Sequence, residues 1–272
     1  MQTSMKHLLP IVSLAAVALI GGFTECKGDI TTKDDDSMSE IICMDPPAET
    51  IVMTEDGIEA IAEPSVIVDS LPRLTIYYPQ YSRIDIACGK RPSQADPTVI
   101  FMAAGAFTGD YQEDFKHSNI AGDHVSGGKR EKGFKCKRNT GAFIWTSDGP
   151  EFHYLSYSSA LDKAARKGGC AFAQEMMIHE RRIVKHTRPD GNQNEFRALC
   201  LIDGKVAVAD SKGSVRFGDF INDLREAGAT EALYMDMGAG WNFSWYRAEN
   251  GHPVEIHSIP IKYSTNWVTF YR

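Results

Sequence analysis

The sequence predicts an α+β fold, a single strand-rich domain with a mixed β-sheet and a few helices. Short runs rich in β-branched and aromatic residues recur between residues 74 and 271, as expected for strands. Residues 160–167 and 217–227 have apolar residues at helical spacing, and a glycine follows each stretch. Strands and helices do not alternate regularly, which argues against a parallel βαβ sheet.

The strands are predicted from local composition. They are expected at 74–78, 84–88, 98–102, 143–146, 152–157, 196–202, 205–209, 232–235, 242–247 and 267–271. Asp203-Gly204 is a preferred two-residue turn, so 196–202 and 205–209 should form a hairpin. Residues 171–179 are apolar without a clear period, and 103–140 looks like a long ordered loop. Cys200 lies in an apolar run and is expected to be a buried thiol.

The N-terminus has the pattern of an export signal, predicted at residues 1–25. Lys6 and His7 precede the apolar stretch 8–20, which is too short to favour a membrane span. Cys26 follows, so the segment resembles a bacterial lipoprotein signal in which that cysteine is acylated. The prediction is an exported protein, either secreted or attached to a membrane through the lipid, in the periplasm or at the cell surface. A plain signal peptide and an uncleaved anchor are the alternatives.

The negative charge of the chain is concentrated in a predicted tether, residues 26–63. Residues 27–63 hold two lysines against eleven acidic residues, whereas 64–272 hold 26 basic and 24 acidic residues. A segment of this composition repels itself and stays extended. The remaining body, 64–272, is the predicted domain. Because it is nearly neutral, nucleic acid is not expected as a partner.

The most informative candidate is Asp236. It ends an apolar run and is followed by Gly238, Ala239 and Gly240. A carboxylate at the end of a buried strand can be held at the mouth of a cleft, where glycines let a ligand approach the backbone. The alternative is that Asp236 caps its own turn.

A second group of candidates lies in the loop 117–129, which combines imidazoles, an amide, a hydroxyl, glycines and a lysine. Its members are His117, Asn119, His124, Ser126, Gly127, Gly128 and Lys129. Backbone N–H groups in such a loop can form an anion-binding nest, and a lysine adds a point charge. The spacing is not that of a phosphate-binding loop, and an ordinary polar surface loop explains the composition equally well.

Glu175 and His179 share a face on either a helix or a strand, so they are a candidate acid–base pair. A structural hydrogen-bonded pair is the alternative. Arg197 opens a predicted strand and could clamp a phosphate with two hydrogen bonds, or form a surface ion pair. No Cys-x-x-Cys or His-Glu-x-x-His motif is present, so no metal site or cofactor is predicted, and a divalent cation requirement stays open.

The alternating segment 241–247 completes the candidates with Trp241, Asn242 and Ser244. Aromatic faces suit sugar rings, and the amide and hydroxyl suit sugar hydroxyls. Core packing is the alternative for the aromatic side chains.

The order of these parts resembles the phosphodiester glycosidase family, which is related to the lysosomal uncovering enzyme. The resemblance covers about residues 70–272, the length of one domain. Family members have an Asn-Gly-Gly-Phe-Phe-like segment, where 103–107 here reads Ala-Ala-Gly-Ala-Phe. They also have an Ala-Leu-x-Leu-Asp-Gly-Gly-Gly-Ser-like segment, matched by 232–240 with Asp236 at the acidic position. Ala103 replaces the family asparagine, and Trp241 with Asn242 replaces the serine.

The resemblance implies a divergent exported bacterial glycoside hydrolase that cleaves a sugar 1-phosphodiester or a related glycan, with an anionic or phosphorylated glycan as its partner. Asp236 would position or activate the reacting group, and Glu175 or His179 would supply acid–base function. Arg197 and Lys129 would hold the phosphate. The alternatives are a non-catalytic glycan-binding lipoprotein, consistent with Ala103, and a surface protein with a structural or partner-binding role.

Overall fold

The computed structural model describes residues 52–54, 57–59, 65–136, 140–189, 191–258 and 263–272. The predicted signal peptide, Cys26 and most of the predicted tether lie outside the described residues. A short antiparallel hairpin, β1 (Val52–Thr54) with β2 (Gly57–Glu59), falls within the stretch predicted as tether. Among the residues that the structure describes, no helix is long and apolar enough to cross a membrane.

The described chain is mostly β, so the predicted α+β class with a mixed sheet is wrong. The described residues form two α-helices, and the named strands pair only in antiparallel fashion. Two stretches that were not predicted as strands account for part of the error. Residues 171–179 lie within the long strand β11 (Cys170–His179), and the predicted loop 103–140 contains the hairpin of β7 (His124–Ser126) and β8 (Lys129–Glu131).

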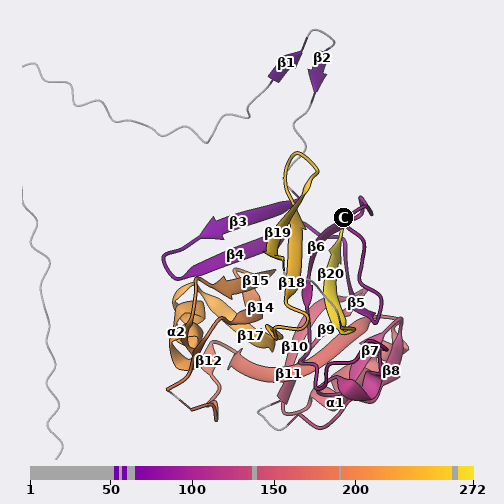
Figure 1. The fold of residues 1–272 in the computed structure, drawn as a ribbon, viewed down its shortest axis with the longest axis vertical. Helices are drawn as coiled ribbons and strands as arrows, with labels where there is room; N and C mark the ends of the chain where they lie inside the picture. Colours follow the sequence, from indigo (N-terminus) through magenta and orange to yellow (C-terminus); the bar gives the residue numbers. More distant parts are fainter. Residues whose placement is uncertain (1–51, 55–56, 60–64, 137–139, 190, 259–262) are drawn as a thin grey trace, which may run out of the picture. The chain divides into compact units, whose positions relative to one another are not determined.

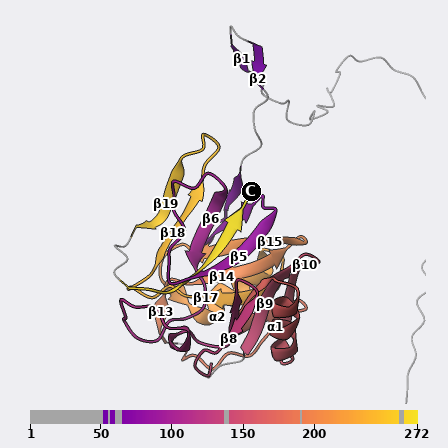
Figure 2. The same cartoon turned by 90° about the vertical axis from the view of Figure 1, so that its right-hand side faces the viewer.

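The larger sheet joins strands from most of the domain (Figures 1 and 2). Its order is β10 (Gly149–Tyr154), β9 (Thr140–Thr146), β11, β17 (Ala229–Met235), β14 (Arg197–Ile202), β15 (Lys205–Ser211), β4 (Leu74–Pro79) and β3 (Val66–Ser70). The strands β7 and β12 (Arg182–Ile183) also pair with β11, and β8 pairs with β7.

The smaller sheet has the order β19 (Pro253–Ser258), β18 (Phe243–Arg247), β6 (Val99–Ala104), β20 (Asn266–Tyr271) and β5 (Arg83–Cys88). A separate two-stranded ribbon pairs β13 (Gln193–Asn194) with β16 (Val215–Arg216). The largest apolar cluster takes side chains from both large sheets, including Phe101 and Phe270 from the smaller one and Phe172 and Leu233 from the larger one. The two sheets therefore enclose one core, and burial of these side chains is the main stabilising term.

Both predicted helices are confirmed as α1 (Tyr157–Arg166) and α2 (Phe217–Glu226). Figure 1 shows α2 near β17 and α1 near β7 and β8. Each helix is followed by a glycine with positive φ, Gly168 at 66° and Gly228 at 89°, as expected where a helix stops.

The predicted hairpin of 196–202 and 205–209 is confirmed as β14 and β15, with Ile202 paired to Lys205. Asp203 and Gly204 both have positive φ, which is the geometry of the turn that matches strand twist. Cys200 is buried in β14, as predicted.

Candidate functional site

The two segments that carry the family resemblance meet where β6 and β17 end. The backbone N–H of Asp236 donates to the carbonyl oxygen of Gly105 at 2.8 Å. In return, the N–H of Thr108 donates to Oδ2 of Asp236 at 3.0 Å. Since β6 belongs to the smaller sheet and β17 to the larger one, this contact lies where the two sheets join.

The Asp236 carboxylate is buried, with 1% of its surface exposed. Besides Thr108, the N–H of Gly238 donates to Oδ1 at 2.9 Å, and the indole Nε1–H of Trp241 donates to Oδ2. Burial raises the pKa of Asp236 to about 6, although these N–H donors oppose the shift. The carboxylate therefore fixes its own turn, which is the structural role that the sequence left open.

The glycines after Asp236 make room for side chains of this chain. A Cβ atom at Gly238 would lie 2.7 Å from the indole Nε1 of Trp241, so only glycine lets that indole reach the carboxylate. A Cβ atom at Gly240 would lie 2.3 Å from the ring of Tyr111. The space that was predicted for a ligand at Gly238 and Gly240 is thus filled by Trp241 and Tyr111.

Replacing Asp236 by asparagine should change how stability depends on pH. Above about pH 6 the Asp236 carboxyl is ionised in both the folded and the unfolded protein, and burial of this charge destabilises the folded protein. Below about pH 4 the carboxyl is protonated in both, so this destabilisation is absent. The wild-type free energy of unfolding, relative to Asp236→Asn, should fall by about 3 kcal/mol as pH rises from about 4 to 6, and then stay level. Urea denaturation of both proteins across this range measures the difference. Parallel curves would contradict the assignment.

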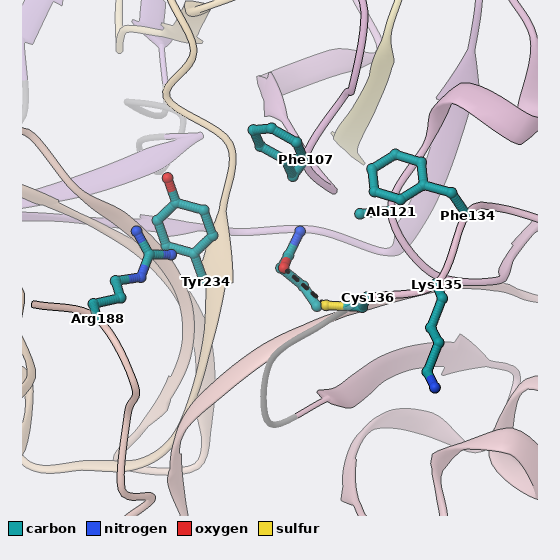
Figure 3. A pocket seen from close by; sticks show the side chains of 8 residues that line it. Phe107, Ala121, Phe134, Lys135, Cys136, Arg188 and Tyr234 are labelled. Atoms are coloured by element: carbon teal, nitrogen blue, oxygen red, sulfur yellow. Dashed lines mark hydrogen bonds between the residues drawn. The ribbon is translucent and has the colours of Figure 1, made fainter.

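A cavity of about 360 Å³ lies beside this junction (Figure 3). Its lining combines aromatic, basic, amide and thiol side chains: Phe107, Ala121, Phe134, Lys135, Cys136, Gln174, Arg188 and Tyr234. Figure 3 shows Arg188 and Tyr234 on one side, Phe134 and Lys135 on the other, and Cys136 between them. The cavity therefore offers both positive charge and aromatic surface to one ligand.

Arg188 is the best-positioned cation of this cavity. Its Nε and Nη2 atoms donate to Oε2 of Glu175 at 2.9 and 2.8 Å, and Glu175 is 1% exposed. The guanidinium also lies 4.4 Å from the ring centre of Tyr234 and 4.1 Å from that of Phe217. A buried carboxylate and two aromatic rings thus fix the side chain before any ligand arrives.

Neither Arg188 nor Lys135 is among the site residues predicted from the sequence. A signal for Arg188 was present, because Glu175 lies alone in a long apolar run and a buried carboxylate needs a cationic partner. Lys135 lies in a run of basic residues between 129 and 138, and nothing in the local pattern distinguishes it from its neighbours.

Glu175 and His179, the predicted acid–base pair, have different partners. Glu175 binds Arg188, whereas Nδ1 of His179 lies 2.9 Å from Oε2 of Glu231. The β11–β17 pairing shifts register between Met176 and Ile178. Such a bulge breaks the regular alternation of side chains on which the prediction rested.

Arg197 forms a bidentate contact, as predicted, but its partner is a carboxylate inside the protein. Its Nε and Nη2 atoms donate to the two oxygens of Asp210 at 2.6 Å each, and Nη2 also donates to Ser244 at 2.9 Å. Arg197 is 0% exposed. Burial alone would raise the pKa of Asp210, but the charge and hydrogen bonds of Arg197 outweigh it and lower that pKa. This contact ties β14 and β15 to β18.

The predicted anion-binding loop is largely a tight hairpin. Gly127 and Gly128 have φ values of 57° and 73° and form the turn between β7 and β8. Nζ of Lys129 lies 2.6 Å from Oε1 of Glu131 in an exposed ion pair. The hydroxyl of Ser126 donates to the carbonyl of Ile86 at 2.7 Å.

The other members of this loop are also bonded internally. Asn119 exchanges two hydrogen bonds of 2.9 Å with the backbone of Asp110. Nδ1 of His117 lies 2.8 Å from Nε2 of His124, and their rings stack. The thiol of Cys88 is close by, so that one donor atom from each of these three residues lies within 4.8 Å of the others. The sequence spacing gave no indication of this group, because Cys88 comes from a distant strand.

The residues predicted to contact sugar in 241–247 are buried. Trp241 is 3% exposed, Asn242 is 4% exposed and Ser244 is 0% exposed. Trp245 packs with Trp267 in a cluster on the smaller sheet. The segment serves the core and the Asp236 turn.

Comparison with known proteins finds similarity in structure only. No protein-family model and no curated protein sequence matches this chain. Among solved structures, the zebrafish N-acetylglucosamine-1-phosphodiester alpha-N-acetylglucosaminidase catalytic domain, auto-inhibited by its pro-peptide, matches with a TM-score of 0.53 and 12% identity, over 79% of this chain and 84% of that one. A hypothetical protein from Synechocystis matches with a TM-score of 0.39 and 10% identity, over 76% of this chain and 61% of that one.

The likeness to the zebrafish domain shows a shared fold. At 12% identity it carries no catalytic residue from one chain to the other. The structural relationship expected from the segments 103–107 and 232–240 is thus confirmed at the level of the fold.

Proposed function

We propose that this protein is a hydrolase that binds an anionic glycan, of the sugar 1-phosphodiester class, in the cavity lined by Arg188 and Phe107. The observation that carries the proposal is the combination of two basic side chains with exposed aromatic rings in this one cavity. The shared fold with a glycosidase domain, whose name gives an N-acetylglucosamine-1-phosphodiester as substrate, supports the choice of reaction.

The basic side chains would bind the anionic group. Glu175 takes the Nε and Nη2 donors of Arg188, and in the part of the chain that the structure describes no acceptor bonds its Nη1. A phosphate oxygen can accept from that atom, while the exposed Lys135 adds a flexible point charge from across the cavity. Arg188 would thus orient the phosphate, and Lys135 would add electrostatic attraction to it.

The aromatic side chains would bind the sugar ring. Phe107 is 42% exposed and Phe134 is 37% exposed, and their rings meet edge to face with centroids 6.4 Å apart. Large apolar rings that stay exposed at a cavity are typical of a binding site. The C–H face of a sugar is the apolar surface that such rings would cover.

Asp236 would supply the acid–base step. Burial raises its pKa to about 6, near the pH at which proton transfer is efficient. Its carboxylate bonds the backbone of Thr108, next to the cavity residue Phe107, so the turn must shift on substrate binding for the carboxylate to reach the substrate. Glu175 would act as a positioning residue through Arg188.

Glycan binding without hydrolysis is the second candidate, and one observation favours it. Among the described residues that line the cavity, none carries a carboxylate, whereas glycosidases generally need two at the scissile bond. Asp236 and Glu175 are each buried and hydrogen-bonded.

An assay on a panel of sugar 1-phosphodiesters separates the two functions. Release of free sugar and phosphomonoester by the wild type, lost in Asp236→Asn while the variant still binds by titration calorimetry, would support hydrolysis. Binding without turnover in the wild type would support the second candidate. Neither binding nor turnover across the panel would contradict both.

We also propose, from the sequence pattern alone, that the protein is exported and lipidated at Cys26. Replacing Cys26 by serine should move the protein from the membrane fraction to the soluble fraction, because a lipid anchor supplies the membrane affinity. Fractionation of expressing bacteria measures this, with Cys136→Ser as the matched control that should stay with the membrane. Equal distribution of the two variants would contradict lipidation.

A further inference from the structure

The geometry points to a transition-metal site, with Zn²⁺ as the ion, formed by Cys88, His117 and His124. The site is separate from the cavity and does not depend on the proposed reaction. One donor atom from each residue, a thiol sulfur and two imidazole nitrogens, lies within 4.8 Å of the others.

The donor atoms are close enough to form a tetrahedral zinc site after small movements of the side chains. Zinc bonds of about 2.3 Å to sulfur and about 2.0–2.1 Å to nitrogen place tetrahedral ligand atoms roughly 3.4–3.6 Å apart. Nδ1 of His117 and Nε2 of His124 are now 2.8 Å apart in a hydrogen bond. Separating them by about half an ångström makes room for the ion between them.

The surroundings hold the histidines in a suitable orientation. Nδ1 of His124 faces the carbonyl oxygen of Gly122 at 3.5 Å, which directs Nε2 of this ring toward His117. Metal-binding histidines generally have such a backbone partner on the other nitrogen. The ring of His117 packs edge to face against Phe115, with centroids 4.9 Å apart. Both rings are therefore restrained before the metal binds.

The donor set favours zinc over magnesium or calcium. A thiolate and two imidazoles are borderline-soft ligands, whereas magnesium and calcium select oxygen. Three protein ligands leave a fourth position for water. His124 is 1% exposed, but Cys88 and His117 are only half-buried, so the ion can reach the site from solvent. Binding releases the thiol proton of Cys88 to solvent.

The ion would cross-link the two large sheets. Cys88 ends β5 of the smaller sheet, and His124 begins β7, which pairs with β11 of the larger sheet. His117 lies in the 3-10 turn η1 (His117–Asn119) on the connection between β6 and β7. One ion thus joins three segments that are held together here by hydrogen bonds and packing.

The test uses the full chain, without a polyhistidine tag, stripped with a chelator, loaded with Zn²⁺ or Co²⁺ and desalted. The wild type should retain about one zinc ion per chain and raise its melting temperature on loading. The cobalt form should show the thiolate-to-cobalt charge-transfer absorption of a tetrahedral site. Absence of retained zinc and of this absorption in the folded wild type would overturn the proposal.

Variants then identify the ligands. Cys88→Ser should remove the cobalt–thiolate absorption, and His117→Gln should weaken zinc retention at least about tenfold, since each loses one of three protein ligands. Cys136→Ser, a half-buried thiol outside the group, and His252→Gln, an exposed imidazole, are the matched controls and should bind like the wild type. Circular dichroism checks that each variant folds. Unchanged absorption in Cys88→Ser, or loss in the controls, would show adventitious binding and overturn the site.

Discussion

Replacing Arg197 by methionine is expected to lower the free energy of unfolding by about 3–5 kcal/mol, because it leaves the carboxylate of Asp210 buried without its cation. The two side chains share two hydrogen bonds of 2.6 Å, and Arg197 is 0% exposed. Among the residues that the structure describes, the other cationic neighbour of Asp210 is His257, with Nε2 at 3.5 Å, and it is charged only when protonated. Urea denaturation at neutral pH measures the loss.

Two controls make this stability prediction specific. The double variant Arg197→Met with Asp210→Leu removes both charges and should recover most of the loss, since a buried pair replaced by apolar side chains is often neutral. Lys129→Met breaks the ion pair with Glu131, in which the lysine is 75% exposed, and should change stability far less than Arg197→Met does. Equal effects of Arg197→Met and Lys129→Met would contradict the structural role of the buried pair.

Replacing Arg188 by glutamine is expected to weaken binding of a sugar 1-phosphate about 10–100-fold, the range that a lost hydrogen bond to a charged group supports. Arg188 is held in place by Glu175 and the ring of Tyr234, so its loss removes a cation already oriented toward the cavity. Titration calorimetry with a sugar 1-phosphate, and with the neutral sugar for comparison, measures the effect. The neutral sugar should be affected less.

The matched variants separate binding from folding. Arg188→Gln also removes a charged partner of the buried Glu175. The double variant Arg188→Gln with Glu175→Gln removes that carboxylate as well, and its binding should stay weak whatever its stability, because the cation of the cavity is still missing. Lys135→Gln should weaken binding more modestly, because Lys135 is exposed and flexible. Lys129→Gln should leave binding unchanged. An effect of Lys129→Gln as large as that of Arg188→Gln would place the anion at the hairpin instead of the cavity.

The parts of the fold that depend on neighbouring residues could be predicted from the sequence. The hairpin around Asp203-Gly204 and the two glycine-terminated helices are set by local turn and capping chemistry. The fold class could not be predicted in this way. Whether β11 becomes a strand, and in which direction its neighbours run, depends on pairing with β9 and β17, which are distant in the sequence.

In the candidate site, too, local sequence predicts some features and tertiary contacts determine the others. The sequence marked 103–107 and Asp236 as separate segments of the family resemblance, and only the fold shows that they meet. Local patterns selected Arg197 for its position at a strand start, but only the fold shows that its partner is Asp210. They missed Arg188, whose value comes from Glu175 and Tyr234 meeting it in space. Residue type and spacing thus indicate which side chains can bind an anion, and tertiary contacts decide which of them face a ligand.

We expect an anionic glycan to occupy the cavity between Arg188 and Phe134, and a crystal structure of the protein with a bound sugar 1-phosphate would show whether it does. The phosphate should lie within hydrogen-bonding distance of Arg188 and Lys135, and the sugar ring should lie against Phe107 and Phe134. A ligand found at Lys129 and the β7–β8 hairpin, or an empty cavity at a ligand concentration that saturates binding in solution, would contradict it.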